Sequence, residues 1–201
     1  MSTTKEYQEQ YFLKKQIRVL GIDDAPFDFK DETCLVIAAF FRGGEWMDGV
    51  LSTRVEVDGE DATIKLIDLV NKSKFKAQTR AIFLDGIALG GFNVVNINSL
   101  HKHTGIPVLA IVRKRPDFIT LEKTLKRLGM DRKYQLMEKA GQPKEVKLKQ
   151  GKLFIQTAGI GFEKAEKILR LCCTRSYLPE AIRAAHLIGA GVIKGESKGK
   201  A

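Results

Sequence analysis

The stretch IRVLGIDDAPFDFKDETCLVIAAFFRGGEWMDGVLSTRVEV, residues 17–57, decides the fold of this chain. It contains three runs that are typical of β-strands: an apolar run at 17–22, a β-branched and aromatic run at 33–41, and an alternating apolar and polar run at 46–57. Gly43, Gly44 and Glu45 form a turn that joins the second run to the third as a hairpin. We therefore expect an antiparallel meander of three strands at the start of the domain.

After this meander, predicted helices alternate with predicted strands. Apolar residues at helical spacing predict a helix that opens at 58–61, and further helices are expected at 93–103, 117–128, 162–173 and 179–192. Apolar runs at 81–84 and 107–112 predict strands, and 144–156 is expected to form a polar hairpin or a pair of strands. The order strand, helix, strand favours parallel pairing through right-handed crossovers.

The mixed order of elements indicates the fold class. An antiparallel meander of three strands followed by parallel strands and flanking helices is the ribonuclease-H-like α/β arrangement. A doubly wound Rossmann domain is the alternative, and it is disfavoured because the first strand leads into a hairpin and not into a glycine-rich helix turn. We expect a polar extension at 1–16, one domain at 17–193 and a flexible tail at 194–201.

Composition narrows the classes of protein. A chain of 201 residues with 44% hydrophobic and 29% charged residues has enough apolar side chains for one globular core. Its amino terminus is polar, and no apolar run is long enough to cross a bilayer, so neither a secretory signal nor a membrane partner is expected. Three cysteines, of which Cys172 and Cys173 are adjacent, suit neither a disulfide framework nor a zinc site. These features favour a reducing cytoplasm.

Positive charge is concentrated in one quarter of the chain. The segment 102–152 holds fourteen Lys and Arg against five Asp and Glu, which accounts for nearly all of the net charge of +10. A solvated basic surface is the alternative interpretation. The asymmetry favours a nucleic-acid partner, because contacts between basic side chains and phosphates release counterions.

Chemically capable side chains follow three of the predicted strands. Asp23 comes after IRVLGI, Asp85 after AIFL, and Lys114 lies just past PVLAIV. If the first two strands are neighbours, their carboxylates lie about one strand spacing, roughly 5 Å, apart and repel each other unless a cation lies between them. Mg²⁺, or Mn²⁺ in its place, is the expected cation because it prefers oxygen ligands. Glu60 or Asp61, at the start of the next helix, is the candidate third carboxylate.

An aspartate after a strand is also a common turn former or helix cap. For Asp24 and Asp28 we prefer that interpretation. For Asp23 and Asp85, the shared position at the ends of two core strands, with a basic residue on a third, favours a metal site.

Several segments resemble endonuclease V. GFEKAEKILRLCCTRSYLPEAIRAAHLI (161–188) is similar to the carboxyl-terminal part of that family, and Gly21-Ile22-Asp23, Leu84-Asp85-Gly86 and Val112-Arg113-Lys114 resemble its strand-end motifs. The segments DDAPF, LDGIALGGFN and PEAIRAAHLI more closely resemble an archaeal family of unknown function that is a distant relative of endonuclease V. The resemblance covers nearly the whole chain after residue 16.

The resemblance implies roles for individual residues. Asp23 and Asp85 would be metal ligands, Lys114 would contact the scissile phosphate, and either Glu60 or Asp61 would be the third acid. His186 would lie near the metal, although a lone histidine on an apolar helix is also common in protein cores. The stretch 57–61 lacks the aromatic wedge of endonuclease V, and 87–91 lacks that family's basic and histidine residues, so lesion recognition does not carry over.

Three hypotheses of function follow. The first is a metal-dependent endonuclease, a phosphodiesterase acting on DNA or RNA, with Lys114 and His186 as catalytic residues. The second is a nucleic-acid-binding protein of the same fold without catalysis, and the third is an enzyme that uses the pocket for a small molecule such as a nucleotide. The residues expected to bind nucleic acid are Arg113, Arg115, Lys123, Arg127, Arg132 and Lys133.

Overall fold

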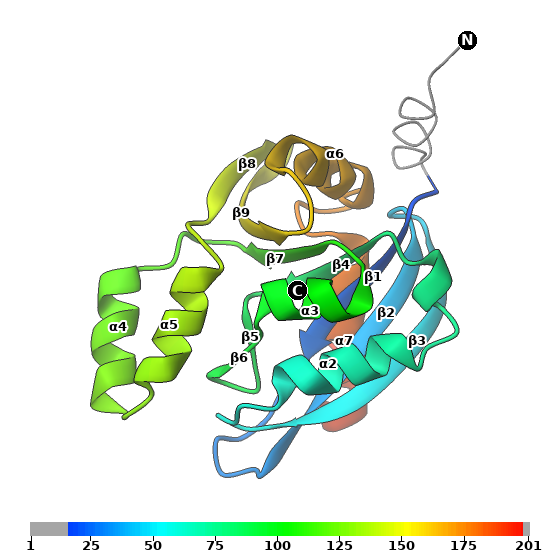
Figure 1. Ribbon diagram of the computed structural model, residues 1–201. Coiled ribbons are helices and arrows are strands. Elements are labelled where there is room, and N and C mark those ends of the chain that lie inside the picture. The colour runs from blue at the N-terminus through cyan, green and yellow to red at the C-terminus, as the bar shows by residue number, and fades with distance from the viewer. Residues whose placement is uncertain (1–15, 199–201) are drawn as a thin grey trace.

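A mixed seven-stranded sheet forms the centre of the structure, a computed structural model that describes residues 16–198 (Figure 1). The strands lie in the order β3-β2-β1-β4-β7-β9-β8. Their bounds are β1 Arg18–Asp24, β2 Thr33–Arg42, β3 Trp46–Glu56, β4 Ala81–Asp85, β7 Val108–Val112, β8 Lys144–Leu148 and β9 Gly151–Ala158. A separate short ladder pairs β5 (Ala88–Leu89) with β6 (Asn93–Val94).

The predicted antiparallel meander is confirmed. Strand β2 runs antiparallel to β1 from Arg18↔Arg42 to Asp24↔Val36, and β3 runs antiparallel to β2. On the other side of β1, strands β4 and β7 follow in parallel, as the alternation of strands and helices predicts. The β8–β9 hairpin then joins the sheet through an antiparallel pairing of β9 with β7.

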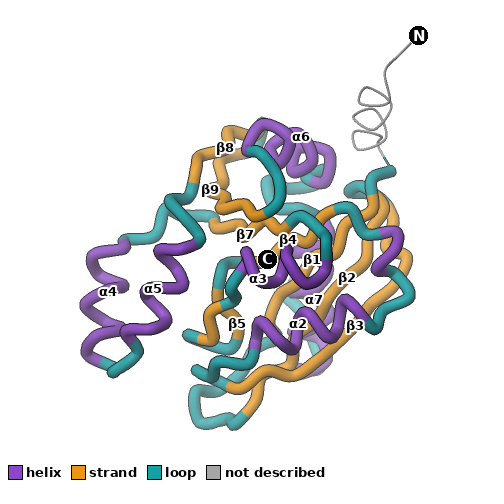
Figure 2. Tube along the Cα trace, viewed as in Figure 1, coloured by secondary structure: helices purple, strands orange, loops and turns teal. Residues whose placement is uncertain are grey.

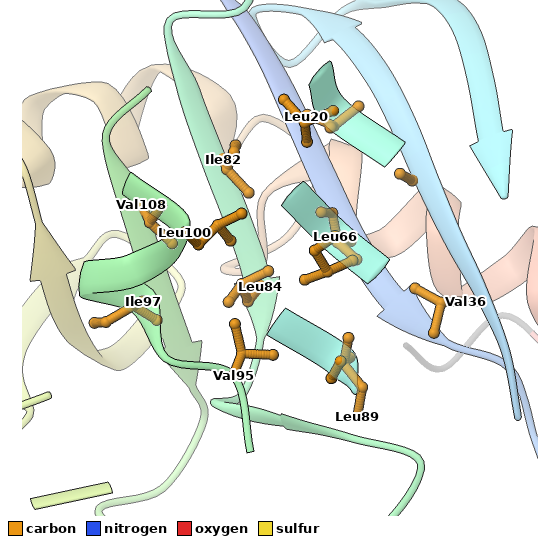
Figure 3. Close-up of a cluster of buried hydrophobic side chains, with 14 of the residues drawn as sticks. Leu20, Val36, Leu66, Ile82, Leu84, Leu89, Val95, Ile97, Leu100 and Val108 are labelled. Carbon is orange, nitrogen blue, oxygen red and sulfur yellow. The ribbon is translucent and has the colours of Figure 1, made fainter. Parts of the chain in front are cut away.

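Helices cover both faces of the sheet, and each face has its own core. Helices α2 (Ala62–Asn71) and α3 (Ile97–Thr104) pack on one face, where alternate residues such as Leu20, Ile82 and Val108 point toward them (Figure 3). Helices α6 (Phe162–Cys172) and α7 (Glu180–Lys194) pack on the opposite face. Because side chains alternate along a strand, the central strands are apolar on both faces.

Helices α4 (Phe118–Arg127) and α5 (Asp131–Lys139) form a hairpin that extends away from the sheet (Figure 2). The hairpin has a small apolar cluster of its own around Leu125 and Met137, which also includes Val94 of β6. Helix α5 was not predicted from the sequence, because its segment DRKYQLMEK is mostly polar and only Lys133 and Met137 are buried. Gly129, with a φ of 69°, lies between the two helices and lets the chain reverse.

Two predicted boundaries need correction. The helix expected at 93–103 begins at Ile97, because 93–94 pair in β6 and the Asn96 side chain caps the helix by accepting from the Ser99 amide. Helix α7 continues to Lys194, two residues beyond the expected end. The expected polar extension, apart from Gln16, and residues 199–201 of the expected tail lie outside the described residues. Across 16–198, no helix has the length and apolar character needed to cross a bilayer.

Candidate active site

Two aspartates lie side by side where β1 and β4 end. The two strands pair in parallel with Ile22 opposite Leu84, so the next residues, Asp23 and Asp85, are neighbours at the same edge of the sheet. Both side chains are nearly buried, with exposed fractions of 6% for Asp23 and 12% for Asp85. The adjacency expected from the sequence therefore holds in the structure.

Helix α7 crosses β1 at unusually close range. A Cβ atom added to Gly21 would lie 2.3 Å from the Ala181 carbonyl carbon, and one added to Gly189 would lie 2.9 Å from the Cβ of Ala25. These separations are too short for any larger side chain at Gly21, so the glycine allows the helix to rest directly on the strand. The close packing fixes where the intervening turn of α7 lies, and that turn carries His186.

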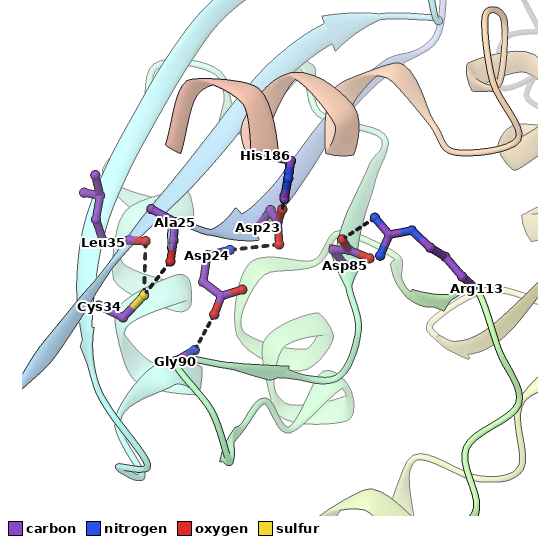
Figure 4. A network of polar contacts seen from close by, with 9 residues as sticks. All are labelled: Asp23, Asp24, Ala25, Cys34, Leu35, Asp85, Gly90, Arg113 and His186. Atoms are coloured by element: carbon purple, nitrogen blue, oxygen red, sulfur yellow. Dashed lines mark hydrogen bonds and ion pairs between the residues drawn. The ribbon is translucent and has the colours of Figure 1, made fainter. Parts of the chain in front are cut away.

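His186 contacts Asp23 directly (Figure 4). Its Nδ1 atom lies 2.9 Å from the Asp23 Oδ2 atom, while the Asp24 amide donates to Asp23 Oδ1 over 3.0 Å. The carboxylate of Asp24 accepts in turn from the Gly90 amide at 2.8 Å. The end of β1 is thus tied both to α7 and to the segment that follows β4.

A second charged pair lies at the end of β4. Arg113, which follows β7, donates from Nη2 to the Oδ2 atom of Asp85 over 3.1 Å. The Arg113 side chain is about one-third exposed, whereas that of Asp85 is nearly buried. Its positive charge offsets part of the negative charge that the two aspartates bring together.

Burial dominates the electrostatics of the pair of aspartates. Desolvation raises the pKa of Asp23 to about 7, against the hydrogen bond from His186, which lowers it, and with the charge of Asp85, which raises it further. Desolvation also raises the pKa of Asp85, and Arg113 opposes that shift. The hydrogen bond to Asp23 raises the pKa of His186. Perturbed groups of this kind, gathered in one pocket, mark a candidate functional site.

These groups line a pocket of about 620 Å³. It is lined by Asp23, Asp85, the segment from Asp24 to Pro26, His186 and Arg113. The lining also includes two aromatic residues of the β1–β2 loop, Phe27 and Phe29, together with Gly86 and Val112.

The donor set of the pocket fits a magnesium-type ion that shares its ligands with a substrate. Asp23 and Asp85 supply hard carboxylate oxygens and repel each other, so a divalent cation between them would relieve an unfavourable interaction. Within residues 16–198, no group of three His, Cys, Asp or Glu side chains is arranged as a complete metal cage. Mg²⁺ is commonly held by one or two carboxylates together with waters and substrate phosphates, and the pocket matches that pattern.

Comparison with known proteins gives the family. A model of the family described as Endonuclease dU matches residues 15–193. The chain belongs to the Endonuclease dU family. A UPF0215 protein from Methanothermobacter thermautotrophicus is 48% identical over 192 residues, which cover 94% of each chain. The crystal structure of a protein of unknown function from Archaeoglobus fulgidus is 38% identical, with a TM-score of 0.79 over 88% of this chain and 98% of that one.

The distant resemblance of this Endonuclease dU family member to endonuclease V is also confirmed. The Ciona intestinalis endonuclease V structure has a TM-score of 0.54 at 14% identity, covering 90% of this chain and 92% of that one. Identity at this level reports the fold alone, and that fold is the ribonuclease-H-like arrangement predicted from the order of elements.

Only some of the residues implied by the resemblance to endonuclease V line the pocket. Asp23, Asp85 and His186 meet in the pocket, whereas Lys114 is exposed and does not line it. The basic residue that reaches the aspartates is its neighbour Arg113, which the sequence placed among the nucleic-acid-binding residues. Asp24, which we interpreted as a turn residue, also lines the pocket. The one feature of the sequence that could have predicted this role is the position of Asp24 directly after Asp23.

Neither candidate for the third acid lines the pocket. The Asp61 carboxylate accepts from the Glu56 amide at 3.0 Å and from the Asn93 side chain at 2.7 Å, so it holds the start of α2 against β6. Glu60 is exposed and lines a different cavity, between α2 and α5. The structure therefore does not bring a third carboxylate from 60–61 to the two aspartates.

The predicted nucleic-acid-binding residues other than Arg113 separate into two groups. Four of them, Arg115, Lys123, Arg127 and Arg132, are exposed on the α4–α5 hairpin or the loop that leads into it. Lys133 does not belong to this surface, because its side chain is 6% exposed and its Nζ donates to the main-chain carbonyl of Asp58. We call the four exposed residues the basic arm.

Proposed function

We propose that this chain is a divalent-metal-dependent phosphodiesterase that cleaves DNA or RNA. The observation that carries the proposal is the pairing of Asp23 and Asp85 as buried neighbours at the ends of parallel strands. Two buried carboxylates this close raise each other's affinity for protons or cations, and such an arrangement serves little purpose in a purely structural sheet edge.

Four residues of the pocket have roles in this proposal. Asp23 and Asp85 would hold Mg²⁺ or Mn²⁺, and such an ion would supply Lewis-acid chemistry at a phosphate group. His186 holds a proton beside Asp23 and is the candidate general acid or base, since its pKa is raised by that contact. Arg113 orients Asp85 and contributes positive charge at the place where a phosphate would approach.

Nucleic acid is the substrate class that the remaining evidence supports. The basic arm places positive charge on a hairpin whose loop begins at Arg113, next to the pocket, and exposed Lys114 is the proposed phosphate contact between the two. The family description contains dU, and the Ciona endonuclease V was crystallised with a DNA containing an inosine. We therefore choose strands with one deoxyuridine or one inosine as the first substrates to test. The three free cysteines suit action in the reducing cytoplasm.

The proposal is tested by calorimetric titration of Mn²⁺ into the wild type, Asp23→Asn and Asp48→Asn. Asp48 is the matched control, because it pairs with Arg42 at the opposite end of the sheet. We expect Mn²⁺ to bind the wild type and the Asp48 variant but not Asp23→Asn. Cleavage of labelled DNA and RNA strands should follow the same pattern. Equal cleavage by wild type and Asp23→Asn would overturn the proposal.

One observation favours a second candidate, a nucleic-acid-binding protein without catalysis. The Arg113 guanidinium already contacts Asp85 Oδ2 at 3.1 Å and offsets part of its charge, which weakens the case for a cation at the same oxygen. This candidate predicts that strands bind equally well in chelator and in Mg²⁺, with no cleavage in either. Loss of the negative charge in Asp85→Asn would then leave the affinity for nucleic acid unchanged.

A further inference from the structure

Phe29 is an exposed aromatic side chain on the wall of the candidate active site. Residues 16–198 leave nine large apolar side chains exposed, and Phe29 has the largest exposed fraction, 71%. It is also the one member of that group that lines the pocket of Asp23 and Asp85. Isolated exposed apolar residues are common, but one that faces a polar pocket requires a specific explanation.

The ring of Phe29 lies against two other residues, Phe27 and Gly91. Its centroid lies 5.3 Å from that of Phe27 at an interplanar angle of 72°, an edge-to-face contact, and Phe27 itself packs against the main core. Gly91 also lies near the ring, since an added Cβ atom there would come within 3.3 Å of Phe29 Cε1. Phe29 is therefore supported by two segments of the chain and still presents much of its surface to solvent.

The loop that carries Phe29 is ordered by its own hydrogen bonds. The Asp28 amide donates to the Asp31 carboxylate at 2.9 Å, the Lys30 amide donates to the Asp28 carboxylate at 2.9 Å, and the Asp31 amide donates to the Asp28 carbonyl at 2.9 Å. A ring fixed in advance loses little conformational entropy when it binds a ligand.

Charge around Phe29 restricts what it can bind. Asp28, Asp31 and Glu32 flank it against a single lysine, Lys30, so this loop repels a phosphate. A flat, uncharged ring is the complementary ligand, because every nucleobase offers a face for stacking on an aromatic side chain. The nearly buried aspartates of the pocket favour a metal ion and with it a phosphate. A nucleotide carries both groups in one unit.

We propose that Phe29 is the base-stacking residue of this pocket and that it holds a nucleobase of the bound strand outside the normal base stack. The inference rests on the proposed function, since it requires a nucleic-acid strand in the pocket. It adds a source of selectivity: a base leaves the stack at least cost where it is unpaired, mismatched or damaged. Phe29 thus favours strands that contain such a base over regular duplex.

The test compares base-bearing and abasic single strands of DNA, with Ca²⁺ in place of Mg²⁺ to separate binding from cleavage. The wild type, Phe29→Ala, Phe29→Trp and Trp46→Ala are titrated against one labelled strand that carries all its bases and one whose central nucleotides are abasic. Trp46 is a matched control, an exposed aromatic residue that pairs with Arg42 at the other end of the sheet.

We expect Phe29→Ala to weaken binding of the base-bearing strand about tenfold or more, the change that corresponds to removal of one base–aromatic stack. Its affinity for the abasic strand should not change. Phe29→Trp should restore tight binding, and Trp46→Ala should match the wild type for both strands.

Two outcomes would overturn the inference in different ways. Phe29 does not stack on a base if Phe29→Ala binds both strands as the wild type does, or if it loses affinity for both equally. In that case the proposed function still stands, provided that the wild type cleaves in Mg²⁺. If the wild type binds neither strand and cleaves nothing in Mg²⁺ or Mn²⁺, the inference and the proposed function both fail.

Discussion

The Nδ1 atom of His186 lies 2.9 Å from the Oδ2 atom of Asp23, although 163 positions separate the two residues in the sequence. The contact joins the last described helix to the first strand. The contact also places the imidazole of His186, which can transfer protons, next to the carboxylate of Asp23, whose pKa is raised by burial.

Removal of the histidine should separate proton transfer from metal binding. We expect His186→Ala to reduce the rate of strand cleavage by about 10²- to 10⁴-fold, the range found for loss of a general acid or base. Mn²⁺ should still bind, because both aspartates remain. Single-turnover rates and calorimetry on the same preparation measure the two effects. Loss of Mn²⁺ binding in this variant would instead make His186 a metal ligand.

Asp23→Asn should stabilise the metal-free fold in a way that depends on pH. The pKa of Asp23 rises on folding from its ordinary 3.8 to about 7, so the folded state binds this proton more tightly than the unfolded state. The stability that the proton contributes is fully present below about pH 3.8 and is lost as the pH rises through about 7. Asparagine cannot ionise and avoids that loss.

At about pH 8 in chelator we therefore expect Asp23→Asn to exceed the wild type by about 1–2 kcal/mol in the free energy of unfolding. The difference should shrink steadily as the pH is lowered toward 4. Urea unfolding at several pH values measures it. If the difference in the free energy of unfolding grows on acidification, ionised Asp23 does not destabilise the wild type.

Gly21 and Gly191 should respond to alanine in opposite directions. A methyl group at Gly21 would collide with the main chain of Ala181, so Gly21→Ala is expected to destabilise the fold by about 1–3 kcal/mol and to move His186 away from Asp23. Gly191 lies in α7, as Ala181 does, but a Cβ atom added to Gly191 would have no neighbour within 4 Å. There, alanine should stabilise by up to about 1 kcal/mol. Thermal unfolding of both variants provides the comparison, and a neutral Gly21→Ala would refute the close contact.

Asp61→Ala should affect stability and leave metal binding intact. The substitution removes the acceptor for the Glu56 amide and the Asn93 side chain, and unsatisfied groups of this kind cost about 1–3 kcal/mol. Glu60→Ala, at an exposed position, is the control and should change neither property. If Asp61→Ala abolishes Mn²⁺ binding while the protein remains folded, the third acid implied by the resemblance to endonuclease V reaches the site after all.

Charge reversal on the basic arm should weaken the binding of nucleic acid and flatten its dependence on salt. We expect the triple change Lys123→Glu, Arg127→Glu and Arg132→Glu to lower the slope of log affinity against log salt by about 0.7 for each phosphate of a single strand that the variant no longer neutralises. Lys65→Glu, on the exposed side of α2, serves as the control. Anisotropy titrations at several salt concentrations measure the slope. An unchanged slope would exclude the basic arm from the binding surface.

The sequence was sufficient for most of the sheet. The central strands are short apolar runs with distinct ends, and Asp23 and Asp85 mark two of those ends, so their adjacency followed once the strands were assumed to pair. The position of His186 came from the resemblance to endonuclease V, since spacing along the chain does not report which strand a helix covers. Gly21 carried a further signal: a glycine within a core strand often marks a close approach of another backbone.

Other features depend on contacts that no local pattern records. Lys133 belongs to a basic segment, yet its ammonium group bonds to the carbonyl of Asp58, 75 residues earlier. Helix α5 is stabilised by packing against α4 and β6, so its own polar sequence gave little indication of it. Asp61 looked like a possible metal ligand because it is an acid at a helix start, and only the fold reveals its hydrogen bonds to β3 and β6.

The position of α7 on β1 also sets the order in which the site is assembled during synthesis. Ribosomes add about 5–20 residues per second, beginning at the amino terminus. The three strands of the meander are therefore available well before Glu180–Lys194. Until this helix leaves the ribosome and docks over Gly21, Asp23 has no histidine partner and the pocket lacks one of its walls. The pocket is therefore complete only after nearly all of the domain has been synthesised.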